Sequence, residues 1–252
     1  MSSDSNIDAV PPEPVSVVLI AYNEAETIEN DVEGFYREVV EKLPGSELIV
    51  SEDGSTDGTS EILKGISRRL PIRLIQDRAR KGYVRALFDA LEQSGCEWVL
   101  FSDTGGKFNP RDFRKLEPYR RSADLIVAVK VARKDQLYRR LMTRVFNRLV
   151  SCYFGVSVHD IDSGFRLYRR SLLEGASAGE MIFRDLINAE LSLRMLASGA
   201  RLREVPVFAT ARPNQSRGMP PGKIPGVIIH VLTSFPALKR EMRRLRKSAS
   251  RA

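Results

Sequence analysis

Short apolar runs alternate with longer amphipathic segments along the first half of the chain. The apolar runs are rich in β-branched or aromatic residues and end in turn residues, so they predict strands at Val15–Ile20, Leu48–Val50, Arg73–Gln76 and Trp98–Phe101. Between them apolar residues recur at helical spacing, which predicts helices over Thr27–Leu43, Ser60–Leu70 and Val84–Ser94. Strands that alternate with helices are typical of a parallel sheet covered by helices. We therefore expect an α/β fold with a mostly parallel, Rossmann-like sheet flanked by helices in a single domain.

The second half of the chain is less regular. It predicts two further strands, Leu125–Val131 and Arg203–Phe208, and two further helices, Leu137–Cys152 and Phe183–Ala197. The last strand contains a proline and is expected at an edge of the sheet. We expect three regions: a disordered leader over residues 1–14, the folded domain over residues 15–222, and a tail over residues 223–252.

The predicted tail joins an apolar stretch, Ile224–Phe235, to a cluster of basic residues. This cluster contributes to a formal net charge of +8 and consists of Lys239, Arg240, Arg243, Arg244, Arg246, Lys247 and Arg251. An apolar stretch followed by basic residues suits peripheral contact with an anionic membrane surface. Nucleic acid is not expected as a partner, because no nucleic-acid motif is recognised and no aromatic residues interleave with the basic ones.

The location of the protein is indicated by its N-terminal residues and its cysteines. Residues 1–14 are polar and do not resemble a signal peptide, and no run reaches the ~18 apolar residues of a membrane span. The two cysteines, Cys96 and Cys152, lack metal-type spacing and are expected as buried free thiols in a reducing compartment. We expect a cytoplasmic protein that its tail holds at the inner face of the cell membrane.

Three acidic residues follow strands of the predicted sheet: Glu24, Asp53 and Asp103. Each alone is compatible with a plain turn, but ligands of open α/β sheets bind beyond the carboxyl ends of the strands. Carboxylates at that edge accept hydrogen bonds from a base N–H or from ribose hydroxyls, so three of them indicate a nucleotide site. A dinucleotide site and a P-loop are disfavoured, because no G-x-G-x-x-G follows the first strand and no P-loop motif is present.

A series of motifs over roughly residues 15–220 resembles the family 2 glycosyltransferases with the GT-A fold, most of all the dolichyl/polyprenyl-phosphate sugar transferases. Val17–Ile28 is similar to that family's opening strand and Y-N-E loop, and Glu52–Thr59 to its D-D-G-S-x-D-x-T turn. Lys81-Gly82 resembles the end of its G-K-G segment, and Asp160–Arg170 its D-x-x-S-G-F-R acceptor-side motif. The last matches are to its E-V-P-V strand and the R-x-x-G-x-S-K that follows, at Glu204–Val207 and Arg212–Arg217.

This resemblance implies roles for individual residues. Asp53 would contact the nucleotide base, and Asp103 would be the first residue of the family's Asp-x-Asp signature. The implied donor-binding residues are Ala21, Tyr22, Asn23, Glu24, Asp53, Lys81, Ser102, Asp103 and Thr104. The implied acceptor-binding residues are Arg133, Arg140, Asp162, Arg212 and Arg217, and the implied catalytic residues are Asp103, Lys107, Asp160 and Arg166. Glu190 matches a family glutamate on a later helix, with a different spacing.

The chain departs from the family at that signature. In the polyprenyl-phosphate branch it often reads Asp-x-Asp-x-Gln and holds Mg²⁺ or Mn²⁺, whereas the corresponding residues here are Asp103, Gly105 and Lys107. Hard divalent cations need several oxygen ligands, so Asp103 alone is a weak metal ligand. At ~4 Å and an effective dielectric of ~20, even two unit charges interact by about 4 kcal/mol, so Lys107 would repel a metal. We expect either a metal-free site in which Lys107 neutralises the leaving diphosphate, or an inactive relative with a degenerate loop.

The motifs together predict a glycosyltransferase that moves a sugar from a UDP or GDP donor to a polyprenyl phosphate, with inversion, in cell-envelope glycan biosynthesis. Arg140, Arg144 and Arg148 recur every four residues and suit an anionic acceptor, although a solvated helix face has the same pattern. An ionised lipid phosphate needs no general base, whereas a hydroxyl acceptor would need Asp160 or Asp162. Two alternatives stay open: transfer to a hydroxyl of a sugar or small molecule in glycan or natural-product assembly, and a non-catalytic protein that binds sugar nucleotides.

Overall fold

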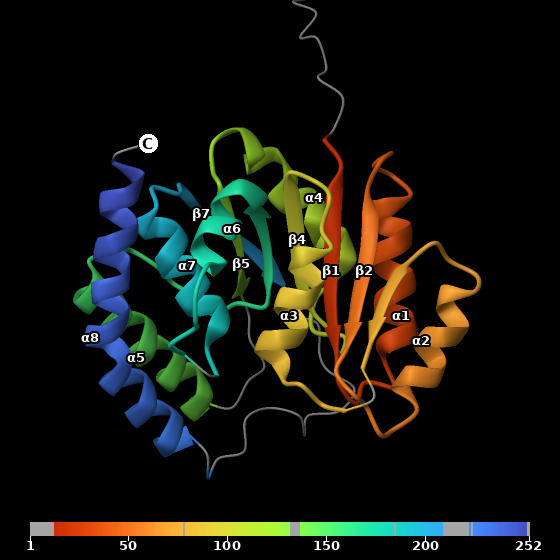
Figure 1. The fold of residues 1–252 in the computed structure, drawn as a ribbon, viewed down its shortest axis with the longest axis horizontal. Helices are drawn as coiled ribbons and strands as arrows, with labels where there is room; N and C mark the ends of the chain where they lie inside the picture. Colours follow the sequence, from red (N-terminus) through yellow and green to blue (C-terminus); the bar gives the residue numbers. More distant parts are fainter. Residues whose placement is uncertain are drawn as a thin grey trace, which may run out of the picture.

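The computed structural model describes residues 13–77, 79–131, 137–183, 185–208, 222 and 224–250. Within these ranges seven strands form one sheet in the order β3-β2-β1-β4-β6-β5-β7 (Figure 1). The strands are β1 (Val15–Ala21), β2 (Glu47–Glu52), β3 (Arg73–Gln76), β4 (Trp98–Asp103), β5 (Leu125–Val131), β6 (Phe165–Arg169) and β7 (Leu202–Phe208). Six of them were predicted from the sequence, with small differences in their ends.

The sheet is mostly parallel, as predicted. β1 pairs in parallel with β2 and β4, β2 with β3, and β5 with β7. β6 lies between β4 and β5 and is antiparallel to both. The sequence analysis missed β6, because two arginines interrupt its apolar pattern. One of them, Arg166, is nevertheless fully buried in the structure.

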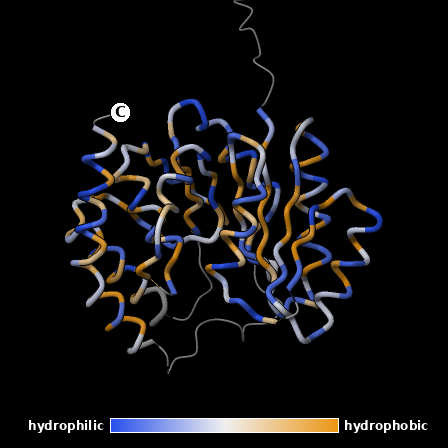
Figure 2. The backbone as a smooth tube through the Cα atoms, viewed as in Figure 1, coloured by the Kyte–Doolittle hydropathy of each residue, from blue (hydrophilic) through white to orange (hydrophobic). Residues whose placement is uncertain are grey.

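Helices cover both faces of the sheet (Figure 1). They are α1 (Ile28–Phe35), α2 (Thr59–Ser67), α3 (Tyr83–Glu92), α4 (Phe113–Leu116), α5 (Leu137–Phe154), α6 (Arg170–Ser177), α7 (Ile187–Ala197) and α8 (Ile224–Ala249). One apolar core joins the sheet to α1, α2 and α4, and a second joins it to α3, α6 and α7. The central strands are apolar along most of their length, as Figure 2 shows, because both of their faces are covered.

The segment predicted as a tail is mostly one long helix, α8, and it belongs to the fold. Its inner side chains Val231, Phe235, Leu238 and Met242 join a third apolar cluster with α5 and α7. The helix is therefore held by packing, although its second half is as basic as predicted. Among the helices that the structure describes, none combines the length and apolar character needed to cross a membrane.

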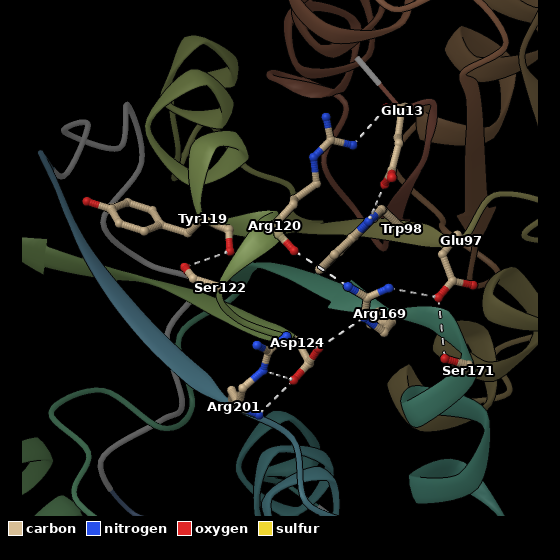
Figure 3. A network of polar contacts seen from close by, with 10 residues as sticks. All are labelled: Glu13, Glu97, Trp98, Tyr119, Arg120, Ser122, Asp124, Arg169, Ser171 and Arg201. Carbon is tan, nitrogen blue, oxygen red and sulfur yellow. Dashed lines mark hydrogen bonds and ion pairs between the residues drawn. The ribbon is translucent and has the colours of Figure 1, made fainter. Parts of the chain in front are cut away.

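A polar network joins the segment before β1 to the amino end of β4 (Figure 3). Trp98 Nε1 donates a hydrogen bond of 2.8 Å to Glu13 Oε2, and Arg120 donates one of 2.7 Å to the Glu13 carbonyl. Glu13 thus belongs to the folded domain, although the leader was predicted to reach residue 14; the leader's first twelve residues lie outside the described ranges.

Both cysteines are free thiols, but they are less buried than predicted, because Cys152 is exposed and Cys96 half-buried.

Candidate active site

The carboxyl ends of β1, β2 and β4 lie side by side and bring the predicted acidic positions to one edge of the sheet. In the register of the sheet Ala21 of β1 is opposite Glu52 of β2, and Ile20 is opposite Asp103 of β4. The loops that begin there carry Glu24 and Asp53. The structure therefore brings the three predicted carboxylates to one edge, as expected for an open α/β sheet.

The loop after β1 is joined to the loop after β2 by hydrogen bonds. The backbone N–H of Asn23 donates to Ser55 Oγ at 2.9 Å, and that of Glu24 donates to Thr59 Oγ1 at 2.8 Å. Asn23 Oδ1 in turn accepts the Thr56 N–H at 2.8 Å. Asn23 has a φ of 54°, in the left-handed region that asparagine tolerates better than most residues. These bonds hold the predicted Tyr22–Glu24 segment beside Asp53.

Asp53 is buried and organises the loop that precedes α3. Its Oδ1 accepts the backbone N–H groups of Lys81 and Gly82 at 2.8 and 2.9 Å, and its Oδ2 lies 3.7 Å from Arg80 Nε. The Arg80 guanidinium stacks 4.1 Å from the centre of the Tyr22 ring. Lys81 contributes its backbone to this site, because its ammonium is paired with Asp77 and Asp89. Lys81 thus lies at the predicted donor edge, with its backbone N–H bonded to Asp53 and its ammonium in ion pairs.

Asp103 is the last residue of β4, and both of its carboxylate oxygens have protein partners. Tyr83 OH donates to Oδ1 at 3.1 Å, and Lys107 Nζ lies 2.9 Å from Oδ2. Burial works to raise the pKa of Asp103, but Lys107 and, more weakly, Lys130 outweigh it and hold the pKa below its usual value. Asp103 is therefore an ionised carboxylate held in an ion pair.

A second buried carboxylate sets the shape of the loop between Asp103 and Lys107. Asp31 Oδ2 accepts the N–H groups of Gly105 and Gly106 at 2.7 and 3.1 Å. Burial raises the pKa of Asp31 to about 6, despite these two bonds. Gly105 has a φ of +86°, and a Cβ placed there would lie 3.0 Å from the Glu24 carboxylate oxygens. An aspartate at position 105 would thus suffer both backbone strain and like-charge repulsion.

The residues at this edge do not fit a divalent cation. Asp103 is the only carboxylate left at the three signature positions, and an ammonium already bonds to one of its oxygens. In the part of the chain that the structure describes, no group of three or more His, Cys, Asp or Glu side chains could hold a metal ion. At the signature positions Gly105 supplies no side-chain ligand, and the Lys107 ammonium lies where it pairs with Asp103.

A cavity of about 610 Å³ opens next to Asp103 and has two chemically different ends. Its polar end is formed by Asp103, Lys107, Lys130, Asp160, Asp162, Ser163 and Gly164. Its apolar end is formed by side chains of α5 and α8, among them Leu141, Val145, Phe146, Leu149, Val227, Ile228, Val231 and Leu232. The cavity can therefore bind a ligand that carries both a charged group and an apolar chain.

The two aspartates of the acceptor-side motif line this cavity together with Asp103. Burial raises the pKa of Asp162 to about 7; Arg166 opposes that rise, while Asp160 and Asp103 add to it. Asp162 Oδ1 accepts the Ala189 N–H at 3.1 Å, and Asp160 is held through its backbone N–H, which donates to Glu204 Oε1 at 3.1 Å. Asp162 can thus change its charge near neutral pH.

Three predicted site residues have structural roles instead. Arg166 was expected on the acceptor side, but it is fully buried and donates to the carbonyls of Ile161, Ser163 and Asn188 and to Ser192 Oγ. Ser102 is fully buried and donates to the Asp103 carbonyl, and Thr104 donates to the Ile20 carbonyl at 2.8 Å. These three side chains position the backbone beneath the site and do not reach into the cavity.

The remaining predicted residues fall into two groups. Arg133, Arg212, Arg217 and the side chain of Arg140 lie outside the described residues. Ala21 and Glu190 lie within them: Ala21 is buried and accepts the Asp53 N–H at 2.9 Å, and Glu190 is buried in an ion pair with Arg194. Glu190 also accepts the N–H groups of Ile182 and Phe183, so its role is to fix the segment before α7.

The sequence analysis missed two residues at the site, Lys130 and Tyr83. Lys130 lies at the carboxyl end of β5, lines the cavity, and has its ammonium 4.0 Å from the centre of the Phe108 ring. Its signal was a lysine that interrupts an otherwise apolar strand. Tyr83 begins α3 directly after Lys81-Gly82, and its hydroxyl accepts a hydrogen bond of 3.3 Å from Asn188 Nδ2 while it donates to Asp103.

Comparison with known proteins groups this chain with sugar transferases. Residues 16–175 match the family model described as Glycosyl transferase family 2. The chain is 27% identical over 167 residues to an undecaprenyl-phosphate 4-deoxy-4-formamido-L-arabinose transferase of Pseudomonas aeruginosa, a match that covers 65% of this chain and 49% of that protein. It is 26% identical over 214 residues to the polyprenol monophosphomannose synthase of Mycolicibacterium smegmatis, covering 80% of this chain and 79% of that one.

The chain spans about half the length of the first curated relatives that it matches. Among solved structures it is similar to the glucosyl-3-phosphoglycerate synthase of Mycobacterium tuberculosis, in a complex with Mn²⁺, UDP-glucose and phosphoglyceric acid. That likeness has a TM-score of 0.65 at 20% identity and covers 89% of this chain and 80% of the other. It confirms the predicted GT-A fold.

Proposed function

The chain belongs to glycosyl transferase family 2, and from that premise we propose that it transfers a sugar from a nucleoside diphosphate to the phosphate of a polyprenyl lipid. The observation that carries this proposal is the cavity, which joins two ammonium groups near Asp103 to an apolar wall from α5 and α8. A lipid phosphate matches this arrangement, because its anionic phosphate is joined to an apolar chain. The names of the relatives above, which use undecaprenyl phosphate and polyprenol, support the same class of acceptor.

The donor would bind along the edge formed by β1, β2 and β4. The Tyr22–Glu24 loop and the buried Asp53 would receive the nucleotide base, with Arg80 stacked on Tyr22 beside it. The diphosphate would then extend toward Asp103, where Lys107 and Lys130 supply positive charge. Both UDP and GDP fit this description.

The reaction would be a single displacement with inversion. An oxygen of the acceptor phosphate forms a bond to the anomeric carbon while the bond from that carbon to the β-phosphate oxygen breaks, and the electron pair leaves with the nucleoside diphosphate. The acceptor phosphate is already ionised, so no general base is needed. The protein aligns the two substrates and stabilises the charge on the leaving group. Lys107, with Lys130 beside it, would perform the second task here, because the residues do not fit a metal ion.

The lipid acceptor also implies where the protein acts. A polyprenyl chain is held in a bilayer, so we place the reaction at the cytoplasmic face of the cell membrane. The basic second half of α8, which contains six lysine or arginine residues and one glutamate, supports contact with an anionic surface.

One observation favours a second acceptor. Asp162 lines the same cavity, and its pKa of about 7 is suited to a general base at neutral pH. A sugar or small-molecule hydroxyl requires such a base, whereas a phosphate does not. The two acceptors therefore predict opposite responses of activity to pH.

The proposal is tested first by calorimetry and then by product analysis. UDP, GDP and their sugars are titrated into the protein in EDTA and again with Mn²⁺; the proposal expects one donor to bind equally in both. The donor that binds is incubated with a polyprenyl phosphate, with the matching polyprenol and with a methyl glycoside, and the products are identified by mass spectrometry. Product from the phosphate alone supports the proposal, and product from a hydroxyl acceptor alone supports the alternative. Binding without any product would show a non-catalytic protein.

A further inference from the structure

Large apolar side chains are exposed together on one side of two neighbouring helices. They are Leu141, Val145, Leu149 and Tyr153 of α5, and Ile228, Ile229 and Leu232 of α8, with exposed fractions of 37–63%. We call these seven residues the α5–α8 face. Among the described residues the only other large apolar side chain of comparable exposure is Phe208 of β7. A contiguous exposed apolar patch of this kind marks an interaction surface, whereas single exposed residues do not.

The opposite sides of the same helices explain why this face stays exposed. Val150 and Phe154 of α5 and Val231 and Phe235 of α8 are buried in the third apolar cluster with α7. The rings of Phe154 and Phe235 pack 4.9 Å apart, so the two helices are joined to each other as well as to the domain. Both helices are therefore fixed by their inner sides, and no described segment covers their outer sides.

Positive charge surrounds the face. Arg144 and Arg148 are exposed on α5 beside its apolar residues, and α5 contains no acidic residue. On α8 the apolar first half is followed by a basic second half, visible as the change from hydrophobic to hydrophilic colours along this helix in Figure 2. Lys239 of this basic half contacts the α5–α8 face, because its ammonium lies 4.4 Å from the centre of the Tyr153 ring of α5.

We propose that the α5–α8 face binds the surface of a bilayer that contains anionic lipids. The apolar side chains would enter the boundary between headgroups and acyl chains, and the flanking cations would contact the anionic headgroups. A second copy of the chain fits less well, because a symmetric contact would bring the arginines of α5 against each other without an acidic partner on that helix.

The face is continuous with the cavity. Leu141, Val145, Leu149, Ile228 and Leu232 belong to both. Docking through this face would thus place the apolar end of the cavity against the bilayer, with Asp103 and Lys107 at its inner end. This step rests on the proposed function: a lipid phosphate would then enter the cavity headgroup first while its chain stays in the membrane.

The test is flotation of the full chain with vesicles of phosphatidylcholine alone, and of phosphatidylcholine with phosphatidylglycerol. We expect flotation with the anionic vesicles, weakening as salt rises. The first variant is Ile229→Glu, which places a charge on the face at a residue that does not line the cavity; its bound fraction should fall roughly tenfold or more. Phe208→Glu is the matched control, because it changes an equally exposed apolar residue elsewhere, and it should float like the unchanged protein.

A second pair of variants tests the charges. Arg144→Glu combined with Arg148→Glu should reduce binding to anionic vesicles, whereas Lys64→Glu, at an exposed position of α2, should have only the small effect of its net charge. Equal flotation of Ile229→Glu and the unchanged protein would overturn the proposal. So would sedimentation of the unchanged protein as a dimer that Ile229→Glu dissociates, since a second copy would then cover the face.

Failure of this proposal is distinguishable from failure of the proposed function. A protein that glycosylates polyprenyl phosphate in detergent but does not bind vesicles retains the function and loses the docking surface. A protein that binds vesicles through Ile229 but forms no product retains the docking surface and loses the function.

Discussion

The ammonium of Lys107 lies 2.9 Å from Oδ2 of Asp103. The two residues stand at the first and fifth positions of the segment that resembles the family's Asp-x-Asp-x-Gln signature. Here the ion pair is internal to the protein, and Lys130 adds a second positive charge that helps to lower the pKa of Asp103. In the proposed reaction these two ammonium groups would stabilise the leaving diphosphate.

Replacing Lys107 by methionine should therefore impair donor use. Removing a group that stabilises charge in the transition state costs about 10²–10³-fold in kcat, and the donor should also bind more weakly in EDTA. The measurements are steady-state kinetics and calorimetry, with Lys115→Met on α4 as the control for loss of a half-exposed lysine. An unchanged kcat, or donor binding by the unchanged protein that appears only with Mn²⁺, would contradict the role given to Lys107.

Restoring the family's signature is a poorer test than it looks from the sequence. Gly105→Asp combined with Lys107→Gln would recreate two oxygen ligands, but Gly105 has a positive φ and its missing Cβ would lie against the Glu24 carboxylate. The single substitution of Lys107 avoids this strain.

Gly164 sets the position of Asp103 from the other side. A Cβ at position 164 would lie well inside contact distance of Asp103 Oδ2, and the Gly164 carbonyl accepts the Asp103 N–H at 2.7 Å. Gly164→Ala should displace the carboxylate from Lys107 and Tyr83, and we expect kcat to fall by roughly 10²-fold, since a misplacement of about 1 Å can have that effect.

The matched control is Gly175→Ala. Gly175 lies in α6, and a Cβ there meets nothing within 4 Å, so this variant should keep full activity and gain about 0.5–1 kcal/mol of stability from better helix propensity. Thermal unfolding shows whether Gly164→Ala is still folded. Full activity of a folded Gly164→Ala variant would show that the position of Asp103 does not matter.

Much of the fold could be predicted from the sequence, because long apolar runs and helical spacing depend on local pattern. Strand β6 could not, since its Arg166 is satisfied by carbonyls from segments that the sequence pattern does not bring together. The tail was separated from the domain for a related reason: its apolar residues are covered by α5 and α7, whose faces cannot be matched to it from spacing alone.

The candidate site, too, could be predicted only in part from the sequence. The carboxylates at the strand ends could be predicted, since they follow from the register of a parallel sheet. The directions of individual side chains could not: Lys81 is turned toward Asp77 and Asp89, and Ser102 and Thr104 bond to the backbone. Lys130 was missed, because a single lysine that interrupts an apolar strand does not by itself show that it faces a cavity.

The charge of Asp162 should control acceptor use near neutral pH. Its pKa of about 7 means that it is neutral in acid and negative in base, beside Asp160 and Asp103. With a phosphate acceptor, the negative form repels the substrate, so kcat/KM should fall as pH rises above about 7, and Asp162→Asn should remove that fall. With a hydroxyl acceptor the negative form is the base, so activity should rise through the same range and Asp162→Asn should abolish it. The pH profiles of the unchanged protein and of Asp162→Asn therefore distinguish a phosphate acceptor from a hydroxyl acceptor.

Asp124 joins two arginines at the end of the sheet opposite the candidate site (Figure 3). Its carboxylate accepts hydrogen bonds of 2.9–3.1 Å from the side chain and backbone N–H of Arg201 and one of 3.0 Å from Arg169 Nε. Arg201 above all, with help from Arg169, holds the pKa of Asp124 well below its usual range, although burial opposes this. Asp124→Asn should therefore lower the free energy of unfolding at pH 7 by about 1–3 kcal/mol.

The sign of the pH dependence follows from that lowered pKa. A carboxylate with a folded-state pKa below its unfolded value stabilises the fold above about pH 4, and this stabilisation is lost as the pH falls below it. Urea unfolding of the unchanged protein and of Asp124→Asn should thus differ at pH 7, and the difference should shrink steadily as the pH falls below about 4. The control is Glu174→Gln, which changes the net charge by the same amount but removes only an exposed ion pair with Arg170. It should change the free energy of unfolding by about 0–1 kcal/mol. If Asp124→Asn matched Glu174→Gln at pH 7, the network around Asp124 would contribute no more than a surface ion pair.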